Sequence, residues 1–443
     1  MAEAPLNVLL LCNRTTGGAD ARTVTDHLDA FTRYSRHRMQ PLSFLRELPA
    51  GMDLCQFDAI IIHYTIAIGW LSEHYMSPAT AAKIRDFPGL KVLFIQDEYR
   101  AVKQLHAALR HMGIDLLCSC VPQGEVEKVY PSSALPGMKV ISTLTGFVPE
   151  TLTQLSVAPI AQRPVDVGYR TRKYPYWLGQ LAYEKWQIAE RFARHAEGSG
   201  LRLDLSHVEG ERLYGSRWIG FIAGCKCVLG VESGSSVFDF DGSVQQQVEE
   251  YVAAHPAASF EEVQRRFLAP HEGRVDYAQI APRCFEAAAL RTVMVLYEGR
   301  YSGVLHPWRH YIPLRRDFSN FQEVTRAIRD PSLLQTIADR AYQEVACNPA
   351  YSYRSFIDRI DDEIVAEFAR RRKRRAEAPY RRSRYLLQLL RSPMYLLNRA
   401  HARVFQWLLL APGRRPLMMR IWTRIPPRER ERIRPLVRRL LGR

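Results

Sequence analysis

Short apolar runs alternate along the chain with longer stretches in which apolar residues recur at the spacing of a helix. Runs in which apolar residues do not alternate with polar ones are typical of strands buried on both faces. Parallel sheets bury their strands in this way because helices cover both of their faces. The pattern therefore predicts an α/β fold.

The first series of predicted elements ends near residue 144. Its strands are expected at 7–12, 58–63, 91–95, 115–120 and 139–144. Its longer helices are expected at 23–34, 78–86 and 101–112. We interpret residues 1–150 as one doubly wound, Rossmann-like domain.

A second series follows a loop-like stretch, 146–164, that holds three prolines. Its strands are expected at 165–169, 202–206, 226–231, 292–298 and 311–314, and its helices at 183–196, 218–223, 244–255, 260–267 and 282–289, with closing helices through 368. Residues 165–369 are therefore predicted to form a second Rossmann-like domain. Ligands of such sheets bind beyond the carboxyl ends of the strands, so we expect a site in the cleft between the domains.

Positive charge is concentrated at the end of the chain. Residues 370–443 hold 23 Lys and Arg against 3 Asp and Glu, a net charge of +20, so residues 1–369 carry −4 of the overall +16. A mildly acidic body argues against a nucleic-acid partner. Apolar clusters such as 404–410 lie among the arginines, as in helices that bind anionic membranes. We expect 376–443 to be an amphipathic helical tail on such a surface, with a dimerisation arm or an RNA-contacting tail as alternatives.

Two further features bear on where the protein acts. The first residues lack the basic segment of a secretory signal, and the apolar runs of the tail are far shorter than the ~20 residues that span a bilayer. We therefore expect a cytoplasmic protein, peripheral at the inner face of the cell membrane. The Cys118/Cys120 and Cys225/Cys227 pairs alternate within apolar runs, which predicts buried free thiols rather than metal ligands.

Residues 281–290 carry the most informative chemical signal. Pro282 suits the first turn of a helix, and Phe285 and Ala289 lie on one face of that helix. Glu286 follows about one turn later, near the free N–H groups and the positive end of the helix dipole. A carboxylate there accepts hydrogen bonds from ribose hydroxyls while the helix end faces phosphate. A solvated glutamate in the first turn is the alternative.

Cationic residues follow the predicted strand at 165–169. Arg170, Arg172 and Lys173 come directly after it, and Arg283 lies beside Glu286. Positive side chains of this kind bind phosphate and diphosphate groups. The alternative is a solvated basic loop, and for Arg283 a surface position.

Small and acidic residues at other strand ends are further candidates for contacts with a nucleotide or its sugar. They are Gly17 and Gly18 after the first strand, Ser233, Gly234 and Ser235 after the 226–231 strand, and Glu298 with Gly299 at the end of the 292–298 strand. Glycine there lets backbone N–H groups approach a phosphate closely. An ordinary turn is the alternative at each position.

The stretches 165–170, 218–230, 232–236, 282–289 and 297–314 follow one another as in glycosyltransferases with the GT-B fold, and the chain most resembles the bacterial group-1 and spore-maturation types. The resemblance is strongest over 165–330. It implies two Rossmann-like domains facing a cleft, no cofactor, and a nucleotide-sugar donor whose ribose binds Glu286. The family pairs this glutamate with a second one eight positions earlier, which is Ala278 here.

The resemblance implies transfer of a sugar from a UDP-, GDP- or dTDP-sugar to a glycan or lipid-linked acceptor, as in the synthesis of surface polysaccharide or lipopolysaccharide. If the reaction inverts configuration, Asp97, Glu98 or His63 removes the proton of the acceptor hydroxyl. If it retains configuration, the leaving phosphate assists and His63 steadies the donor sugar. Asp239 and Asp241 have the spacing of a metal motif but fall in an insertion, and no metal is expected. The alternatives are a sugar-nucleotide epimerase of the same fold and a non-catalytic binding or scaffold protein.

Overall fold

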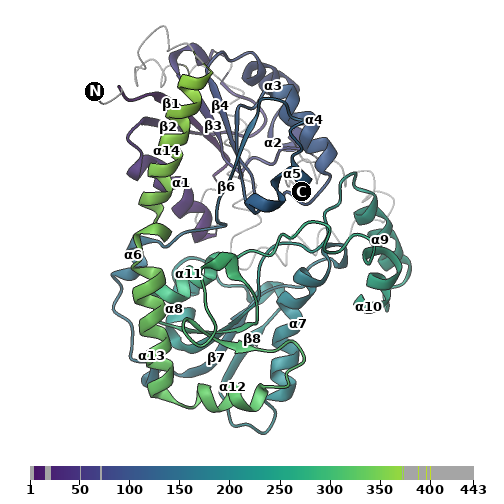
Figure 1. Cartoon of the computed structure of the whole chain (residues 1–443), viewed down its shortest axis with the longest axis vertical. Coiled ribbons are helices and arrows are strands. Elements are labelled where there is room, and N and C mark those ends of the chain that lie inside the picture. Colours follow the sequence, from purple (N-terminus) through teal and green to yellow (C-terminus); the bar gives the residue numbers. More distant parts are fainter. Residues whose placement is uncertain are drawn as a thin grey trace.

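The computed structural model describes residues 4–14, 21–49, 51–69 and 72–371 and the single positions 373, 388, 396 and 400. Gly17 and Gly18 lie outside the described residues, as does the predicted membrane-binding tail, 376–443, apart from positions 388, 396 and 400. Two α/β domains stand one above the other (Figure 1).

The first domain is built on a six-stranded parallel sheet with the strand order β2-β1-β3-β4-β5-β6. Its strands are β1 (Asn7–Cys12), β2 (Arg38–Ser43), β3 (Ala59–Ile62), β4 (Leu90–Phe94), β5 (Leu116–Ser119) and β6 (Lys139–Ser142). Every residue of β3, β4 and β5 is buried, which is why these strands read as unbroken apolar runs.

The sequence pattern predicts no strand at β2. This strand lies at the edge of the sheet, beside β1, and most of its residues are not fully buried. It contains Pro41, which an edge strand tolerates because the missing N–H has no ladder partner to lose. A partly polar edge strand leaves no apolar run for the sequence to show.

The second domain is built on a five-stranded sheet with the order β11-β10-β9-β7-β8, and all of its pairings are parallel. Its strands are β7 (Val165–Arg170), β8 (Leu203–Ser206), β9 (Cys225–Gly230), β10 (Val293–Tyr297) and β11 (Tyr311–Leu314). Each lies close to its predicted position. The strand order reverses between β7 and β9, which is where ligands of such sheets bind.

Helices cover both faces of each sheet. They are α1 (Arg22–Tyr34), α2 (Ser72–Tyr75), α3 (Pro78–Arg85), α4 (Val102–Met112), α5 (Val126–Val129), α6 (Glu150–Thr153), α7 (Gln180–His195), α8 (Gly215–Gly224), α9 (Ser243–Ala254), α10 (Phe260–Val263), α11 (Pro282–Ala289), α12 (Phe321–Ile328), α13 (Pro331–Ala341) and α14 (Tyr353–Arg370). In β10, Val293 and Val295 belong to the apolar cluster that includes α7, α12 and α13, whereas Met294 and Leu296 face α8 and α11.

The last helix, α14, returns to the first domain (Figure 1). The fully buried residues Ile360 and Ile364 pack in the apolar cluster formed by β1, β3 and β4. Asp361, also buried, accepts hydrogen bonds from the hydroxyl of Ser35 at 2.9 Å and from the backbone N–H of Arg36 at 2.8 Å. The predicted range 165–369 placed this helix in the second domain, because sequence order alone does not reveal a crossing between domains.

A segment of the second domain also packs into the first. Phe238 and Tyr277, which flank the excursion that carries α9 and α10, belong to the core cluster of the first domain. The backbone carbonyls of Asp239 and Phe240 accept hydrogen bonds from the N–H groups of Val102 and Lys103 at the start of α4. The domains are therefore joined by this segment and by α14 as well as by the linker at 146–164.

The structure also bears on the predicted cysteine thiols and on membrane-spanning helices. Cys118, Cys120, Cys225 and Cys227 are buried free thiols, as predicted. Among the described residues, no helix is both long enough and apolar enough to cross a membrane.

The packing of α14 yields a test. Replacing Ile360 by Ala should lower the free energy of unfolding by about 2–5 kcal/mol, because buried apolar contacts are lost and a cavity remains. Asp362→Ala is the control on the same helix, because its ion pair with Arg36 is exposed and should contribute less than about 1 kcal/mol. Urea denaturation measures both, and equal losses would contradict the role assigned to the buried face.

Candidate functional site

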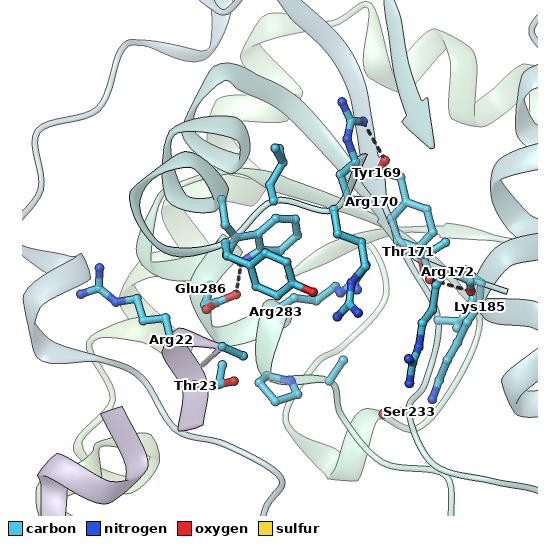
Figure 2. Close-up of a pocket in the computed structure, with 18 of the residues that line it drawn as sticks. Arg22, Thr23, Tyr169, Arg170, Thr171, Arg172, Lys185, Ser233, Arg283 and Glu286 are labelled. Atoms are coloured by element: carbon cyan, nitrogen blue, oxygen red, sulfur yellow. Dashed lines mark hydrogen bonds between the residues drawn. The ribbon is translucent and has the colours of Figure 1, made fainter. Parts of the chain in front are cut away.

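A pocket lies between the domains at the carboxyl ends of β7 and β9 (Figure 2). The second domain contributes the loop after β7, residues 212–218 at the start of α8, and the first turn of α11. The first domain contributes residues 21–23 at the start of α1. The pocket therefore occupies the point where the strand order reverses, as the topology predicts.

Most of the charged side chains that line this pocket are cationic. Three of its arginines have carboxylate partners: Arg22 pairs with Asp26 at 3.2 Å, Arg170 with Asp204 at 2.7 Å, and Arg212 with Glu209 at 3.1 Å. The other three cations, Arg172, Lys185 and Arg283, form no ion pair with any carboxylate of the described residues. The pocket thus holds three cations that form no ion pair with a described carboxylate, an arrangement that suits an anion-binding site.

Tyr174 holds two of these unpaired cations together. The guanidinium of Arg172 lies 5.0 Å and the ammonium of Lys185 4.9 Å from the centre of its ring, and Lys185 also donates to the backbone carbonyl of Gly234 at 3.3 Å. Burial raises the pKa of Tyr174, but Lys185, Arg172 and Arg283 outweigh it, and the net shift is downward. The phenol oxygen therefore lies in a field of concentrated positive charge.

Glu286 is the single carboxylate among the described residues that line the pocket. It is 3% exposed, and burial raises its pKa to about 7. The indole N–H of Trp218 donates a hydrogen bond to Glu286 Oε2 at 2.8 Å. Figure 2 shows Glu286 beside Arg22 and Thr23 of the first domain, across the pocket from Arg172 and Lys185. A polar acceptor and an anion site therefore face the same space.

Several residues predicted from the sequence meet in this pocket. They are Arg170, Arg172, Ser233, Arg283 and Glu286. Lys173 is not among the lining residues, because its ammonium lies 3.7 Å from the carboxylate of Glu190 and stacks on the ring of Trp186. Arg170 lines the pocket, but its pairing with Asp204 and its stacking on Phe221 fix it as part of the wall.

The predicted loop residues of the second domain have structural roles outside the pocket lining. Ser235 is fully buried, and its hydroxyl lies within hydrogen-bonding distance of the carbonyls of Leu178 and Val237. Gly234 has a φ of 106°, and a Cβ there would lie 2.0 Å from the carbonyl oxygen of Tyr277. These contacts shape the loop after β9 rather than a ligand surface.

Glu298 and Gly299 also lie outside the pocket lining. The side chain of Glu298 is exposed, and its backbone carbonyl accepts from Arg316. Gly299 packs against the carboxylate of Glu232, which accepts hydrogen bonds from the N–H groups of Arg300 at 3.1 Å and Tyr301 at 2.8 Å. The glycine is needed there because a Cβ would lie 2.6 Å from Glu232 Oε2.

Two of the three acid–base candidates of the first domain are buried. The carboxylate of Glu98, 2% exposed, accepts hydrogen bonds from Ser119, Tyr130, Tyr277 and the N–H of Cys120. Burial raises its pKa to about 7 despite these donors. The segment that carries Tyr277 covers this side chain, so Glu98 does not face the pocket.

His63 is enclosed as well. Its side chain is fully buried, and its Nε2 lies 2.9 Å from Nδ1 of His27. Burial, the first cause, and the neighbouring His27 hold the pKa of His63 well below its usual value. The imidazole is therefore neutral at physiological pH and part of the core beneath the cleft, which corrects its assignment as a residue that touches a ligand.

Asp97 differs from both. It is exposed and holds a left-handed φ of 58°, a backbone strain that proteins accept mainly where function requires it. Its charge acts to raise the pKa of Lys185, whereas burial lowers that pKa more strongly. Asp97 therefore lies on the side of the first domain that faces the pocket.

The sequence analysis did not single out Lys185, Tyr174, Trp218 or Arg22, all of which line the pocket. Lys185 lies inside α7, and only the packing of that helix against the loop after β7 brings its ammonium to the pocket. Trp218 was expected as the first residue of a predicted helix and of a stretch that resembles the family, without a role at the site. The aromatic run at 174–177 beside cations was a usable signal for Tyr174.

No metal site emerges from the described residues, in which no three His, Cys, Asp or Glu side chains are grouped as a metal would require. The carboxylate of Asp239 accepts hydrogen bonds from the N–H groups of Gly242 and Gln245, both at 2.9 Å. It caps the turn before α9, and Asp241 pairs with Ser243 in the same turn.

Comparison with known proteins shows the fold. The sequence matches no family model, and no curated protein sequence is detectably similar to it. An α-glucosyltransferase solved with UDP-glucose and DNA containing an abasic site has a TM-score of 0.51 and 11% identity, and the match covers 82% of this chain and all of that chain. The chain has a GT-B fold.

Two other solved structures match less closely. Anabaena HepE in complex with UDP has a TM-score of 0.46 and 11% identity over 82% of this chain and all of that chain. AviGT4, a glycosyltransferase of avilamycin A biosynthesis, has a TM-score of 0.40 and 12% identity over 82% of this chain and 98% of that chain.

The burial of Glu286 yields a prediction. Since its folded-state pKa of about 7 exceeds the ordinary 4.5, folding favours the protonated carboxyl. The stability that this proton contributes is complete below pH 4.5 and is lost as the pH rises through 7. Glu286→Gln should therefore be more stable than the wild type at pH 8, by about 1–3 kcal/mol, and nearly equal to it at pH 4.5.

Thermal unfolding at the two pH values measures this difference. The control is Glu298→Gln, because Glu298 is exposed and its substitution should shift the melting temperature little at either pH. A Glu286→Gln variant no more stable than the wild type at pH 8 would contradict the assignment.

Proposed function

We propose that this protein is a glycosyltransferase that binds a nucleotide-sugar donor in the pocket between its domains. The observation that carries the proposal is the combination of three unpaired cations and one buried carboxylate at the reversal point of the second sheet. A diphosphate needs the cations and a ribose needs an acceptor for its hydroxyls.

In this proposal each pocket residue has a separate role. Arg172, Lys185 and Arg283 bind the diphosphate and neutralise the charge that develops on it as the bond to the sugar breaks. Glu286 accepts a hydrogen bond from the donor ribose. Ser233 lies at the rim of the pocket, where it contacts the nucleotide or the sugar. UDP-glucose, bound by the α-glucosyltransferase of the same fold, is the first donor to test, before GDP- and dTDP-sugars.

The acceptor side belongs to the first domain. If the reaction inverts configuration, we assign the removal of the acceptor's proton to Asp97, because its side chain is exposed. Glu98 and His63 are buried, which argues against them as the base. If it retains configuration, the leaving phosphate takes the proton of the acceptor hydroxyl and no such base is needed. A glycan or lipid-linked acceptor at the inner face of the cell membrane suits the basic tail.

A second candidate is a GT-B-like protein that binds a nucleotide sugar without transferring it. Ala278 favours this candidate, because the resemblance implies a glutamate at that position. An epimerase of the same fold has no need for a membrane-bound acceptor, so the tail weighs against it. Transfer or hydrolysis of a bound donor in vitro separates the enzyme from a silent binder.

The cation cluster gives the test of donor binding. Lys185→Met should raise the dissociation constant for UDP roughly 10- to 100-fold, since a hydrogen bond from a charged donor to phosphate is lost. Lys173→Met is the matched control, because Lys173 points to Glu190 outside the pocket lining and should change UDP affinity less than about twofold. Calorimetric titration with UDP measures both, and equal effects would refute the placement of the diphosphate.

The tail gives a separate prediction. The protein should float with liposomes rich in phosphatidylglycerol at low salt, and a chain ending at residue 375 should not, because the basic residues of 376–443 attract anionic lipid. UDP affinity, measured on the same two chains, should be unchanged. Flotation that persists without the tail would exclude the tail as the membrane contact.

A further inference from the structure

The carboxylate of Glu286 is held by a neutral donor although a cation lies nearby. Trp218 Nε1 donates to Oε2 at 2.8 Å. Arg283, less than one helical turn earlier, forms no ion pair with any described carboxylate. Its guanidinium lies 4.9 Å from the ring centre of Tyr169 and 5.7 Å from that of Trp218.

The second oxygen of the carboxylate, Oε1, has no hydrogen-bond partner among the described residues, and Glu286 is part of the pocket lining. One oxygen is therefore fixed by the protein and the other is available to a ligand. A carboxylate oxygen accepts hydrogen bonds only, so its partner must be a donor such as a hydroxyl.

The indole is itself fixed. Its ring stacks on Phe221, with centroids 6.0 Å apart and an interplanar angle of 24°. Trp218 also packs against the apolar cluster that includes Phe285 and Ala288 of α11. The direction of the N–H is therefore set by the packing of α8 against α11.

We propose that Trp218 is a positioning residue for Glu286, holding one carboxylate oxygen so that the other accepts a hydroxyl of the donor ribose. This inference rests on the proposed function. A neutral donor orients the carboxylate and leaves its charge for the ligand, whereas an ion pair with Arg283 would cancel that charge and withdraw Arg283 from the phosphates. The carboxylate of Glu286 and the guanidinium of Arg283 therefore both stay available to bind different parts of the same ligand.

The hydrogen bond has a second consequence, for the ionisation of the carboxyl. Burial raises the pKa of Glu286 to about 7, the hydrogen bond from Trp218 and the charges of Arg283 and Arg22 lower it, and the charge of Asp26 raises it. Without the indole N–H the pKa rises further, and a smaller fraction of Glu286 is ionised at neutral pH. A merely structural role of Trp218 would not change the pH dependence of ligand binding.

The test is UDP binding to Trp218→Phe, measured by calorimetric titration from pH 6 to pH 9. The midpoint of the pH dependence should move up by about one unit, and affinity at pH 7 should fall roughly fivefold and largely recover at pH 9. Incorporation of benzothienylalanine at position 218 makes the same test with the ring shape preserved, so a folding defect of the Phe variant does not block it.

Trp177→Phe is the matched control. Trp177 is fully buried and its Nε1 has no hydrogen-bond partner among the described residues, so the same chemical change is made where no described carboxylate depends on the N–H. Its pH midpoint should equal that of the wild type even if its stability falls. A shift as large as that of Trp218→Phe would overturn the inference.

The outcomes also separate this inference from the proposed function. If Glu286→Gln abolishes the pH dependence of UDP binding but Trp218→Phe leaves the midpoint unchanged, the inference fails and the donor site stands. If the wild-type protein binds no UDP at any pH and no other nucleoside diphosphate, both fail.

Discussion

The packing that joins the two domains is the constraint on which the rest of the structure depends. The apolar face of α14 is buried on the first sheet, and Phe238 and Tyr277 of the second domain are buried in the core of the first. These contacts hold the start of α1 opposite α11, so that both domains line one pocket. Without them the same two sheets would each present half of a site.

The pairing of charged groups in the pocket also differs from that in the rest of the described structure. Burying an ionised group without a charged partner costs free energy, and the mostly buried Arg170 avoids that cost by pairing with Asp204. Glu286 is nearly inaccessible, and Arg172, Lys185 and Arg283 have no carboxylate partner among the described residues. Conflicts of this kind are concentrated at functional sites, where a ligand supplies the missing partner.

The first domain shows how burial separates neighbouring residues with the same chemistry. Asp97 and Glu98 are adjacent carboxylates at the end of one strand, yet Asp97 is exposed and Glu98 accepts four hydrogen bonds inside the protein. The difference arises because Tyr277, from the other domain, closes over Glu98 and leaves Asp97 uncovered. Acid–base chemistry on the acceptor side therefore has one accessible carboxylate at this strand end.

The sequence by itself determined the two sheets, because strands buried on both faces must be apolar throughout, and it missed only β2, whose edge position permits polar residues and Pro41. It also placed Arg172 directly after a strand and Glu286 near the start of a helix, and it expected both at the cleft, since parallel strands bring their carboxyl ends to one edge. Only the tertiary structure decided that Lys185 and Trp218 join them and that Glu98 and His63 do not. Helix packing brings residues that are far apart in the chain to one site. A local sequence pattern does not show which surfaces of one domain are buried by the other.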